Sequence, residues 1–401
     1  MLTNKKIVVG VTGGIAAYKA AELVRQLARL GAAVRVIMTP AAAEFVTPLT
    51  FETLTGQPVL TRLFAGGAGD GTVHIDWARW ADLYVVCPAT ANTIAKLAHG
   101  LADNALTTTL LATTAPILLC PAMNKEMYAN PLYRANEERL RAHGLRIIAP
   151  GRGELACGEV GWGRLAELDE IVDHIRGALE TRRDYQGRRV LVTAGPTHEP
   201  LDPVRYLGNR STGKMGYALA EAAALRGAEV TLISGPGSER PFTGVHLVRV
   251  TTAAEMAAAV QQHLPECDLL LMAAAVSDYR PRALSPAKIK KGEGEMALPL
   301  VRTEDILRSA GRAKGRRIHV GFSVETADEI PASQRKLEEK NLDMIVINNP
   351  LEPGAGFAVE TNKVTLLCRG REPEVWPLLS KREVADRLLT AILTCETQKT
   401  A

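Results

Sequence analysis

Closely spaced cysteines are missing from this sequence, although the chain has 6 cysteines. Zinc sites and redox dithiols need cysteine pairs a few residues apart, so neither kind of site is expected. Cys87 and Cys120 end the apolar runs LYVVC and PILLC, where a small buried hydrophobic residue is the ordinary interpretation. Cys157 lies among glycines instead; a metal ligand there would lack partners, which leaves a nucleophile, an acid or a small apolar residue as interpretations. The remaining cysteines are also isolated along the chain: Cys267, Cys368 and Cys395.

Long apolar runs are missing too. No segment approaches the roughly 18 apolar residues of a membrane span, and the opening MLTNKKIVVGVTGG reaches a glycine turn too early for a signal peptide. The net charge is only +4, which permits anionic ligands but lacks the concentrated basic face of a nucleic-acid binder. We therefore expect a cytoplasmic protein that binds neither membranes nor nucleic acid.

What the chain has is length and an ordinary globular composition, with 401 residues of which 46% are hydrophobic and 23% charged. This length predicts two domains, because single cores usually stop growing at smaller sizes. In the first half, KKIVVGVTG is typical of a buried strand, and IAAYKAAELVRQLARLG of an amphipathic helix that ends at Gly31. Further strand runs are AAVRVIM, ADLYVVC, APILLC and LRIIAP, separated by helical runs. This alternation predicts a parallel sheet covered on both faces.

A polar stretch, TRRDYQGRR at residues 181–189, indicates a linker or a domain boundary. The alternation then restarts at RRVLVTAGPT and continues to a last helix at SKREVADRLLTAIL. We predict an α/β protein of two three-layer domains: a flavodoxin- or Rossmann-like parallel-sheet domain over residues 1–185 and a Rossmann-like domain over residues 186–401.

Glycine turns follow the first strand in both halves, where ligands of open α/β sheets bind. GVTGGIAAYK places Gly13 and Gly14 between strand and helix, but the spacing differs from G-x-G-x-x-G, and a tight turn without a ligand remains an alternative. GNRSTGKM fits a Walker A loop until its last position, where Met215 replaces Ser or Thr. The sequence therefore excludes a P-loop, while the stretch from Ser211 to Lys214, which opens a helix, can hold an anion.

Several long motifs, taken together, resemble one family. In the first half they are HIDWARWAD, PATANTIAKLAHGLADN, PAMN and ACGEVGWGR, and in the second TAGPTHEPLDPVRY, NRSTGKMG, AAAVSDYRP, KIKK and GFSVET. The chain resembles, over nearly its whole length, the bifunctional phosphopantothenoylcysteine decarboxylase/phosphopantothenate–cysteine ligases of bacterial coenzyme A synthesis. The resemblance implies an FMN-dependent decarboxylase domain followed by a CTP-dependent ligase domain.

By this resemblance, FMN is held by a glycine turn and by short polar side chains. A glycine turn suits a phosphate, and short polar side chains suit a flat heteroaromatic ring. Thr90 before IAKLA would, however, also serve as an ordinary helix cap. The residues implied are Gly13, Gly14, Ile15, Thr39, Thr90, Ala91, Asn92, Thr93 and Ala122.

The resemblance also assigns three catalytic residues to the decarboxylase. His74 would be the base, Asn124 would hold the substrate carboxylate or the intermediate, and Cys157 would be the proton donor. Oxidation of the substrate thiol to a thioaldehyde lets carbon dioxide leave as an enethiolate forms, and a thiol can then protonate carbon during reduction. The simpler interpretations are an ordinary histidine at His74 and a helix cap at Asn124.

The ligase domain would transfer CMP from CTP to 4′-phosphopantothenate, and L-cysteine would then displace CMP. Asn209 would act on the acyl-cytidylate, Arg205 on the phosphorylated substrate or the same intermediate, and Lys288 on CTP. A solvated charged face in QRKLEEK and a mobile surface loop at KIKK are the simpler interpretations. The other CTP residues implied are Met272, Ala273, Ala274, Asp278, Glu304, Asp305, Ile306, Leu307, Phe322, Lys336 and Lys340.

The sequence departs from the family pattern at His198, Gly208 and Arg210, where arginine, serine and histidine are usual. It also departs at residues 348–350, where NNP, with Asn349 at its centre, replaces AND, and at Trp77 and Leu165. No departure removes a residue assigned to chemistry. A non-catalytic regulatory flavoprotein that binds a protein partner is the alternative, but such relatives need not keep His74, Asn124 and Cys157 together. The resemblance further implies trimeric flavin domains, dimeric ligase domains and Mg²⁺ bound with CTP, while it names no metal ligand.

Overall fold

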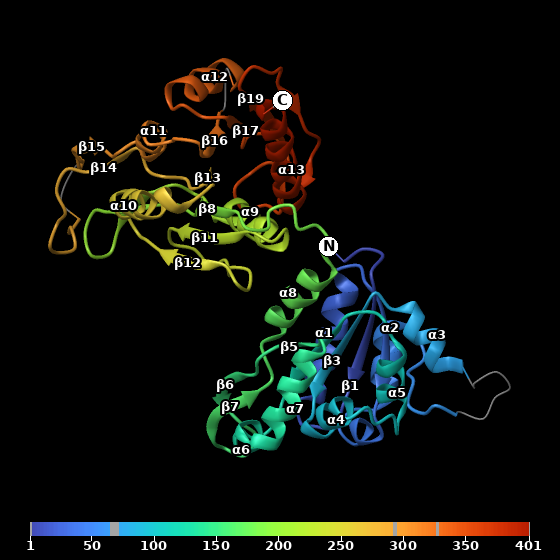
Figure 1. Cartoon of the computed structure of the whole chain (residues 1–401). Helices are drawn as coiled ribbons and strands as arrows, with labels where there is room; N and C mark the ends of the chain where they lie inside the picture. Colours follow the sequence, from blue (N-terminus) through green and yellow to red (C-terminus); the bar gives the residue numbers. More distant parts are fainter. Residues whose placement is uncertain (1, 65–71, 292–294, 326–328, 401) are drawn as a thin grey trace. The chain divides into compact units, whose positions relative to one another are not determined.

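The structure is a computed structural model that describes residues 2–64, 72–291, 295–325 and 329–400. The chain divides into two compact units, Met1–Thr181 and Arg182–Ala401. Each unit has its own central sheet with helices around it (Figure 1).

The first unit is built on a five-stranded sheet in which every pairing is parallel, as the alternating sequence predicts. Five of the six residues of the first strand are buried, because helices cover both sides of this sheet. In sheet order the strands are β2 (Ala33–Met38), β1 (Lys6–Val11), β3 (Leu83–Ala89), β4 (Ile117–Pro121) and β5 (Arg146–Ile147).

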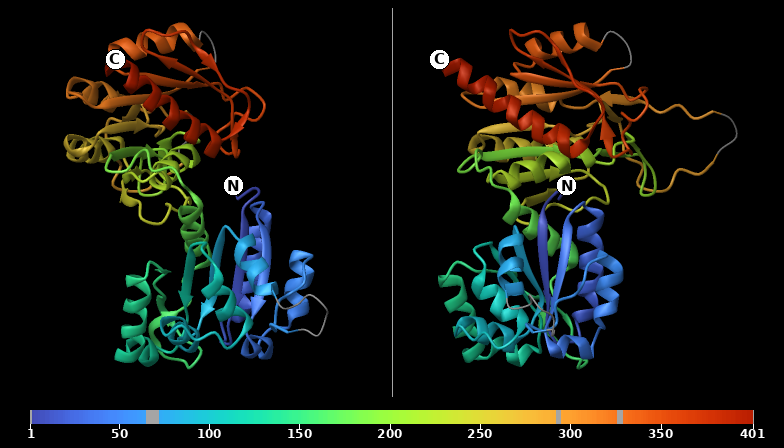
Figure 2. Two further views of the ribbon diagram at one scale, coloured as in Figure 1. Left: turned by 45° about the vertical axis from the view of Figure 1, so that its right-hand side comes forward. Right: turned by 90° about the vertical axis from the view of Figure 1, so that its right-hand side faces the viewer.

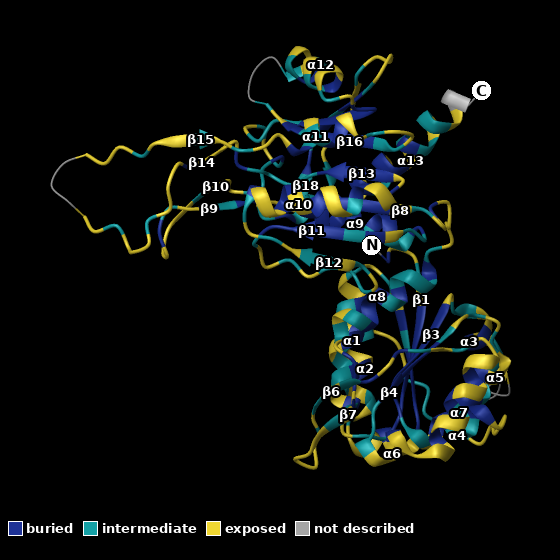
Figure 3. Ribbon diagram, turned by 60° about the vertical axis from the view of Figure 1, so that its left-hand side comes forward, coloured by how far each residue is buried: buried dark blue, intermediate teal, exposed yellow. Residues whose placement is uncertain are grey.

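Two apolar cores flank this sheet, one on each face. One core takes Leu23, Phe51 and Ile171 from α1, α2 and α8, and the other takes Trp77 and Ile94 from α3 and α4 together with residues of α5 and α7. The strands between them are drawn in the buried colour in Figure 3. The helices of this unit are α1 (Ala17–Arg29), the short helix Pro40–Glu44, α2 (Pro48–Thr55), α3 (Val73–Trp80), α4 (Ala91–Ala98), α5 (Ala105–Ala112), α6 (Lys125–Ala129), α7 (Pro131–Ala142) and α8 (Leu168–Leu179).

A small antiparallel hairpin follows β5, formed by β6 (Gly151–Glu154) and β7 (Val160–Arg164). Its tip is closed by two backbone hydrogen bonds, from Leu155 N to Glu159 O at 2.8 Å and from Gly158 N to Leu155 O at 2.8 Å. Gly163 is needed where the hairpin meets β4, because its φ is +129° and an added Cβ would lie 2.2 Å from Met123 O. The hairpin therefore carries Cys157 at its tip and is held close to the end of β4.

The second unit contains an eight-stranded sheet. Its first six strands pair in parallel, whereas β19 and β20 pair antiparallel at one edge. In sheet order the strands are β12 (His246–Arg249), β11 (Glu229–Ser234), β8 (Arg189–Ala194), β13 (Leu269–Met272), β16 (Ile318–Val324), β17 (Met344–Asn348), β19 (Val364–Cys368) and β20 (Glu374–Val375).

Helices cover both faces of this sheet as well. The core on one face includes Leu219 of α9 and Leu388 of α13, and the core on the other includes Met256 of α10 and Ile306 of α11. The helices are α9 (Lys214–Leu225), α10 (Ala253–His263), the short helix Leu264–Glu266, α11 (Ile306–Arg312), α12 (Glu329–Glu339) and α13 (Lys381–Thr400). This arrangement confirms the prediction of two three-layer α/β domains.

Three small two-stranded ladders lie outside the main sheet of the second unit. The described parts of the segment between β14 and β15, residues 282–291 and 295–299, extend away from that sheet, as the orange loop in Figure 2 shows. The ladders are β9 (His198–Pro200) with β10 (Tyr206–Gly208), β14 (Tyr279–Pro281) with β15 (Leu300–Arg302), and β18 (Thr361–Asn362) with β21 (Leu379–Ser380).

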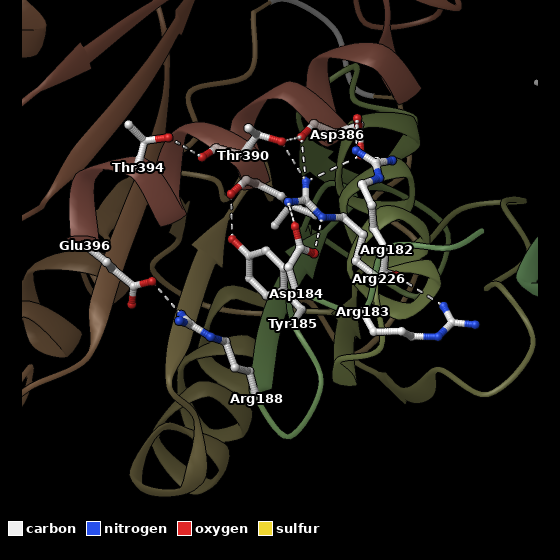
Figure 4. Close-up of polar contacts among 11 residues, drawn as sticks. Arg182, Arg183, Asp184, Tyr185, Arg188, Arg226, Asp386, Thr390, Thr394 and Glu396 are labelled. Atoms are coloured by element: carbon white, nitrogen blue, oxygen red, sulfur yellow. Dashed lines mark hydrogen bonds and ion pairs between the residues drawn. The ribbon is translucent and has the colours of Figure 1, made fainter. Parts of the chain in front are cut away.

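The predicted boundary between residues 185 and 186 differs from the structural division, because residues 182–185 pack in the second unit. Tyr185 is fully buried there, and its hydroxyl donates to Leu389 O of α13 at 2.8 Å. Arg226 donates to both carboxylate oxygens of Asp184, at 2.9 and 2.7 Å (Figure 4). A polar composition suggested a linker, but one buried aromatic ring and one ion pair fix this segment.

Within the described residues, we find no helix that combines the length and the apolar character required to cross a membrane.

Candidate active sites in the two units

A cavity of about 740 Å³ opens at the carboxyl ends of the first unit's strands, where ligands of open α/β sheets bind. Its volume lies within the range of cofactor sites. It brings together six of the nine residues predicted to hold FMN, along with Asn124 and Cys157. The lining residues are Gly13, Gly14, Ile15, Ala16, Tyr18, Lys19, Thr90, Ala91, Ala122, Met123, Asn124, Met127, Glu154, Leu155, Ala156, Cys157, Gly163, Arg164 and Leu165.

The glycine turn between β1 and α1 forms one wall of this cavity. A Cβ on Gly13 would lie 2.5 Å from Ala41 Cβ, so the turn can pass there only without a side chain. Helix α1 begins after Ala16, which supplies no side-chain cap for the first turn. A phosphate could fill that role, because the N–H groups at a helix start are unpaired donors with a favourable dipole.

Threonines supply the polar groups near the turn. Thr90 caps α4 by accepting from Thr93 N at 3.4 Å, and its hydroxyl donates to Thr93 Oγ1 at 3.2 Å. Thr39 is only 8% exposed, and its Oγ1 has no hydrogen-bond partner among the described residues. Such an orphaned buried hydroxyl is compatible with a polar ligand. Thr39, Asn92 and Thr93 do not line the cavity in the described part of the chain, and Asn92 is exposed.

Asn124 and Cys157 meet at the cavity, although they are 33 residues apart in sequence. The amide Nδ2 of Asn124 donates to Sγ of Cys157 at 3.5 Å, while its Oδ1 accepts from Glu126 N at 2.8 Å and caps α6. The helix-cap interpretation of Asn124 and its placement beside the thiol therefore both hold. Cys157 is exposed at the hairpin tip, so its thiol is accessible from the cavity side.

Two charged groups lie beside this pair. The thiol of Cys157 donates to Glu159 Oε2 at 3.6 Å, and Lys125 Nζ lies 3.4 Å from Glu159 Oε1. The hairpin and the start of α6 thus surround the thiol with an amide, a carboxylate and an ammonium group.

His74 is placed apart from this pair. It is half-buried in α3, a helix that packs against α5, and it is not among the described residues that line the cavity. Its role as a base stays a prediction.

The second unit has a smaller cavity, of about 80 Å³, at the start of α9. It joins the predicted anion-binding stretch Ser211–Lys214 to three predicted CTP residues, Ala273, Ala274 and Phe322. Met272, another predicted CTP residue, directly precedes Ala273 in the chain, and Thr193 Oγ1 donates to its Sδ at 3.6 Å. The lining is completed by Met215, Ala275, Val324, Asn348, Gly356, Phe357, Asn362 and Lys381.

Asn209 is held at the rim of the second unit's sheet. Its Nδ2 donates to the carbonyls of Ala275 and Val276, at 3.0 and 3.2 Å. Because these carbonyls follow β13 directly, Asn209 lies beside the strand end that carries Ala273 and Ala274. Asp278 is exposed three residues further on, and its carbonyl accepts from Thr303 N at 2.9 Å.

Lys336 of α12 and Lys340, the residue after this helix, are not simply solvated. Lys336 Nζ donates to Ser323 Oγ at 3.0 Å and to Glu325 Oε1 at 2.5 Å. Lys340 Nζ donates to Asp305 Oδ1 at 3.1 Å. Burial raises the pKa of Asp305, but the hydrogen bond from Arg308 N and the Lys340 ammonium together lower it below its usual value.

These ion pairs join the end of β16 and the start of α11 to one face of α12. The predicted stretch Glu304–Leu307 includes the cap of α11, since Asp305 Oδ1 accepts from Arg308 N at 3.0 Å. Glu304 accepts from Ser309 Oγ at 2.7 Å. Ile306 is buried in the core. The ammonium groups of Lys336 and Lys340 can exchange these carboxylates for phosphates without leaving their helix face.

Comparisons with known proteins agree with this two-site arrangement. A family model described as "Flavoprotein" matches residues 1–180, and one described as "DNA/pantothenate metabolism flavoprotein C-terminal domain" matches residues 185–395. The "Coenzyme A biosynthesis bifunctional protein CoaBC" of Bacillus subtilis (strain 168) is 46% identical over 401 residues, covering 99% of both chains. The chain belongs to the CoaBC family.

Two further relatives match this CoaBC chain. A protein named "Cysteine/Cysteine sulfinic acid decarboxylase", from an unknown prokaryotic organism, is 45% identical over 87% of this chain and 99% of its own. The crystal structure of the C-terminal domain of a CoaBC protein is 39% identical and covers 54% of this chain and 99% of that chain, with a TM-score of 0.47.

Two departures from the usual CoaBC pattern form one contact. His198 and Gly208 are register partners in the β9–β10 ladder, and the ring of His198 stacks on Tyr206 with centroids 3.6 Å apart. A Cβ at Gly208 would lie 3.1 Å from His198 Cδ2 and 2.8 Å from Thr197 O. The absence of a side chain at Gly208 therefore leaves room for the imidazole ring of His198.

The other departures have separate surroundings. Asn349 donates to Glu329 Oε1 at 2.7 Å and accepts from Leu351 N at 2.9 Å, which shapes the turn after β17. Arg210 is exposed, and nothing in the structure explains its choice. Trp77 and Leu165 are buried in the cores of the first unit.

Sequence reasoning did not single out the C-terminal residues of the small cavity. Lys381 is buried and donates to the carbonyls of Gly356, Phe357 and Val359, at 3.3, 2.9 and 2.6 Å. Asn362 is buried, and its Oδ1 has no partner among the described residues. The only sequence signal at Lys381 was the start of a helix at SKREV, and Asn362 lies in a different segment, so folding alone shows that both residues reach this site.

Metal ligation gives no additional site. Among the residues that the structure describes, no group of three or more histidine, cysteine or acidic side chains is arranged to hold a metal ion.

Proposed function

We propose that this CoaBC chain catalyses two consecutive reactions of coenzyme A synthesis in the cytoplasm. The second unit joins L-cysteine to 4′-phosphopantothenate with CTP, and the first unit decarboxylates the resulting 4′-phosphopantothenoylcysteine to 4′-phosphopantetheine with FMN. Family membership supports the pair of activities. The observation that carries the decarboxylase is the contact between Asn124 and Cys157, 3.5 Å apart at the wall of a large cavity.

The cavity fits FMN by its volume and by the side-chain-free turn at Gly13. Gly13, Gly14 and Ile15 would hold the phosphate end, and Thr39, the Thr90–Thr93 stretch and Ala122 the remainder. When bound, FMN supplies two-electron redox chemistry, which converts the substrate thiol into an electron sink for loss of carbon dioxide.

The side chains of the first unit bind substrate and move protons. Asn124 donates its amide hydrogen to the substrate carboxylate or to the intermediate, since its oxygen is already engaged with Glu126 N. Cys157 gives its proton to carbon in the final reduction, and its place on the hairpin tip brings the thiol to the cavity. His74 assists deprotonation of the substrate thiol.

Because His74 lies outside the cavity of its own chain, we propose that a second copy supplies it. Exposed apolar side chains support an assembly of first units: Ile15 and Tyr18 line the cavity, and Val160 and Trp162 lie on the nearby hairpin. Large exposed apolar groups gathered at a site favour an interface. We propose trimers of first units and dimers of second units.

In the second unit, the main tasks are to neutralise a triphosphate and to align a carboxylate for attack. Lys336 and Lys340 bind phosphates of CTP with Mg²⁺, and Ala273, Ala274 and Phe322 flank the nucleotide. Asp278 and Lys288 contact CTP during transfer of CMP. Asn209 then holds the acyl-cytidylate for displacement by the cysteine amine, while Arg205 contacts the phosphorylated substrate.

The test measures both activities with one preparation. Purified protein should be yellow and release FMN on denaturation, and CTP, 4′-phosphopantothenate and L-cysteine should together yield pyrophosphate and carbon dioxide. Pyrophosphate without carbon dioxide would limit the proposal to the second unit. A colourless protein that cannot be reconstituted with FMN would refute the decarboxylase.

Free L-cysteine is a second compound to test, because a relative named as a cysteine decarboxylase is 45% identical. Free L-cysteine added without CTP and 4′-phosphopantothenate tests whether the first unit accepts it directly. We expect no carbon dioxide in this reaction, and release at the rate seen with 4′-phosphopantothenoylcysteine would reassign the substrate.

A further inference from the structure

A buried carboxylate connects two ligase motifs that are distant in sequence. Asp202 of the LDPVR motif is 3% exposed. Its Oδ1 accepts from Val204 N and Arg205 N, both at 2.8 Å, and its Oδ2 accepts from Ile289 N at 3.1 Å. Ile289 belongs to the KIKK motif and directly follows Lys288, so this carboxylate fixes the peptide next to the predicted CTP-contacting lysine.

Two more hydrogen bonds join the same segments. Arg205 Nη2 donates to Ile289 O at 3.0 Å, and Ser285 N donates to Leu201 O at 3.0 Å. Both the N–H and the carbonyl of Ile289 are therefore held by the 201–205 segment. Residues 285–289 have no regular secondary structure, so these contacts rather than a helix or a ladder define their path.

The charge of Asp202 suits this role. Burial raises its pKa, but the backbone N–H groups of Val204, Ile289 and Arg205, together with the Arg205 guanidinium 4.0 Å away, lower it below the usual value. A carboxylate can accept all three N–H groups with its two oxygens, whereas an amide has only one acceptor oxygen.

We propose that Asp202 is a positioning residue of the ligase: it anchors Ile289 and thereby places Lys288 for transfer of CMP to the substrate carboxylate. Arg205 shares this anchoring through its bond to Ile289 O, in addition to any contact with substrate. The inference rests on the role proposed for Lys288. No contact of Asp202 itself with CTP or with either substrate is required.

The experiment is a double-mutant cycle on the full-length holoenzyme, with Asp202→Ala, Lys288→Ala and the double variant. Pyrophosphate release from CTP and 4′-phosphopantothenate measures ligase activation. Carbon dioxide release from added 4′-phosphopantothenoylcysteine measures the other unit. We expect Asp202→Ala to lower kcat for pyrophosphate release about tenfold or more, as a misplaced catalytic group does, with decarboxylation unchanged.

The double variant distinguishes positioning from a general structural role. If Asp202 acts through Lys288, Asp202→Ala should cost little more once Lys288 is already alanine. Asp202→Asn, which keeps one acceptor oxygen, should retain intermediate activity. Hydrogen exchange at the Ile289 amide should accelerate in Asp202→Ala without any substrate present.

A matched control is available on the neighbouring strand β9. Glu199 is 2% exposed, and its Oε1 accepts from Ala253 N at 2.8 Å. Ala253 lies outside the KIKK motif, so this bond does not hold that motif. Glu199→Ala removes a comparable buried carboxylate–backbone bond, so it reports general destabilisation. Its loss of ligase activity should be smaller than that of Asp202→Ala, and it should leave exchange at Ile289 unchanged.

Two results would overturn the inference in distinguishable ways. Positioning by Asp202 is refuted, with the role of Lys288 intact, if Asp202→Ala releases pyrophosphate at the full rate while Lys288→Ala is impaired. It is also refuted if Asp202→Ala lowers kcat by the same factor whether residue 288 is lysine or alanine. Full activity of Lys288→Ala refutes the proposed role of Lys288 and, with it, the reason for placing that residue.

Discussion

The two units of this CoaBC chain share an architecture but differ in how they build a site. In the first unit, a cavity of about 740 Å³ lies beneath a hairpin, and its lining is mostly glycine, alanine and other uncharged residues. In the second unit, the cavity at the start of α9 is about 80 Å³, and predicted CTP residues outside its lining, Lys336, Lys340 and Asp305, are engaged in ion pairs. The difference matches a site that keeps one flat cofactor and a site that receives highly charged substrates.

Both sites nevertheless begin at the same place in the fold, where parallel strands end and helices start. What differs is the segment added there. The first unit adds the β6–β7 hairpin, which delivers a thiol. The second adds α12 and the residue after it, where Lys336 pairs with Glu325 just after β16 and Lys340 pairs with Asp305, the cap of α11. The sheet thus provides the location, and the added segment provides the chemistry.

The largest effect should come from Cys157→Ser, which separates the two units most sharply. We expect final reduction to slow about 1000-fold, within the usual range for loss of a general acid, so an oxidised, decarboxylated product should accumulate. Mass spectrometry of the products and pyrophosphate release measure the two units side by side. Cys395→Ser, which removes a thiol from the second unit, is the control, and normal turnover by Cys157→Ser would end the proton-donor assignment.

Asn209→Ala should give the converse result in the second unit. Loss of the amide that bonds Ala275 O and Val276 O should slow cysteine transfer about 100-fold, comparable to removal of one preorganised donor. The acyl-cytidylate should accumulate and be visible by chromatography, while decarboxylation of added substrate continues. Unchanged amide formation would remove Asn209 from the mechanism.

Lys340→Met tests whether the ion pairs of the second unit serve the nucleotide. We expect KM for CTP to rise about tenfold, since one charge-assisted contact to phosphate is lost, with little change in kcat. Steady-state kinetics at varied CTP measure this. Arg308→Met, which breaks the exposed pair with Glu339 at 2.9 Å on the same helices, should leave KM near its original value; equal effects of both variants would indicate a merely structural role for Lys340.

A smaller effect concerns stability of the second unit at mildly acidic pH. His319 is fully buried in β16, its ring nitrogens have no hydrogen-bond partner among the described residues, and burial together with Lys314 lowers its pKa to about 4. The unfolded chain binds a proton near pH 6.5 but the folded chain does not. The contribution of neutral His319 to the free energy of unfolding is therefore fully present above pH 6.5 and is lost as pH falls towards 4.

Between pH 7.5 and 5.5 this histidine should lower the free energy of unfolding by about 1 kcal/mol. Hydrogen exchange of the β16 amides at the two pH values measures the change. His319→Leu, which cannot be protonated, should flatten the dependence by that amount. An identical pH dependence in both proteins would show that His319 does not contribute.

Much of the fold could be predicted from the pattern of the sequence. Runs such as KKIVVGVTG and LYVVC became central parallel strands because they are apolar throughout, as a sheet buried on both faces requires. The β6–β7 hairpin was not predicted, since GRGE and VGWGR carry little apolar alternation. The polar stretch at residues 181–189 does contain the division between the two units, but its charged composition hid one buried tyrosine.

The candidate sites were predicted in part, through motifs rather than through periodicity. The glycine turn, Asn124 and Cys157 do converge on one cavity, but no spacing rule relates residues 33 positions apart. Isolated cysteines gave no hint that Cys368 and Cys395 would lie with their sulfur atoms 3.8 Å apart. The FMN, CTP and catalytic assignments remain predictions that the experiments above test.

By itself, the sequence determined the number of domains, the alternating strand–helix pattern and the turns at which ligands bind, because apolar periodicity and glycine freedom act over a few neighbouring residues. Only the tertiary structure decided which distant side chains meet: Asn124 with Cys157, Lys340 with Asp305, and Asp202 with Ile289. Such pairs depend on strand order and loop path, and these are set by how whole elements pack together and leave few buried polar groups without a partner.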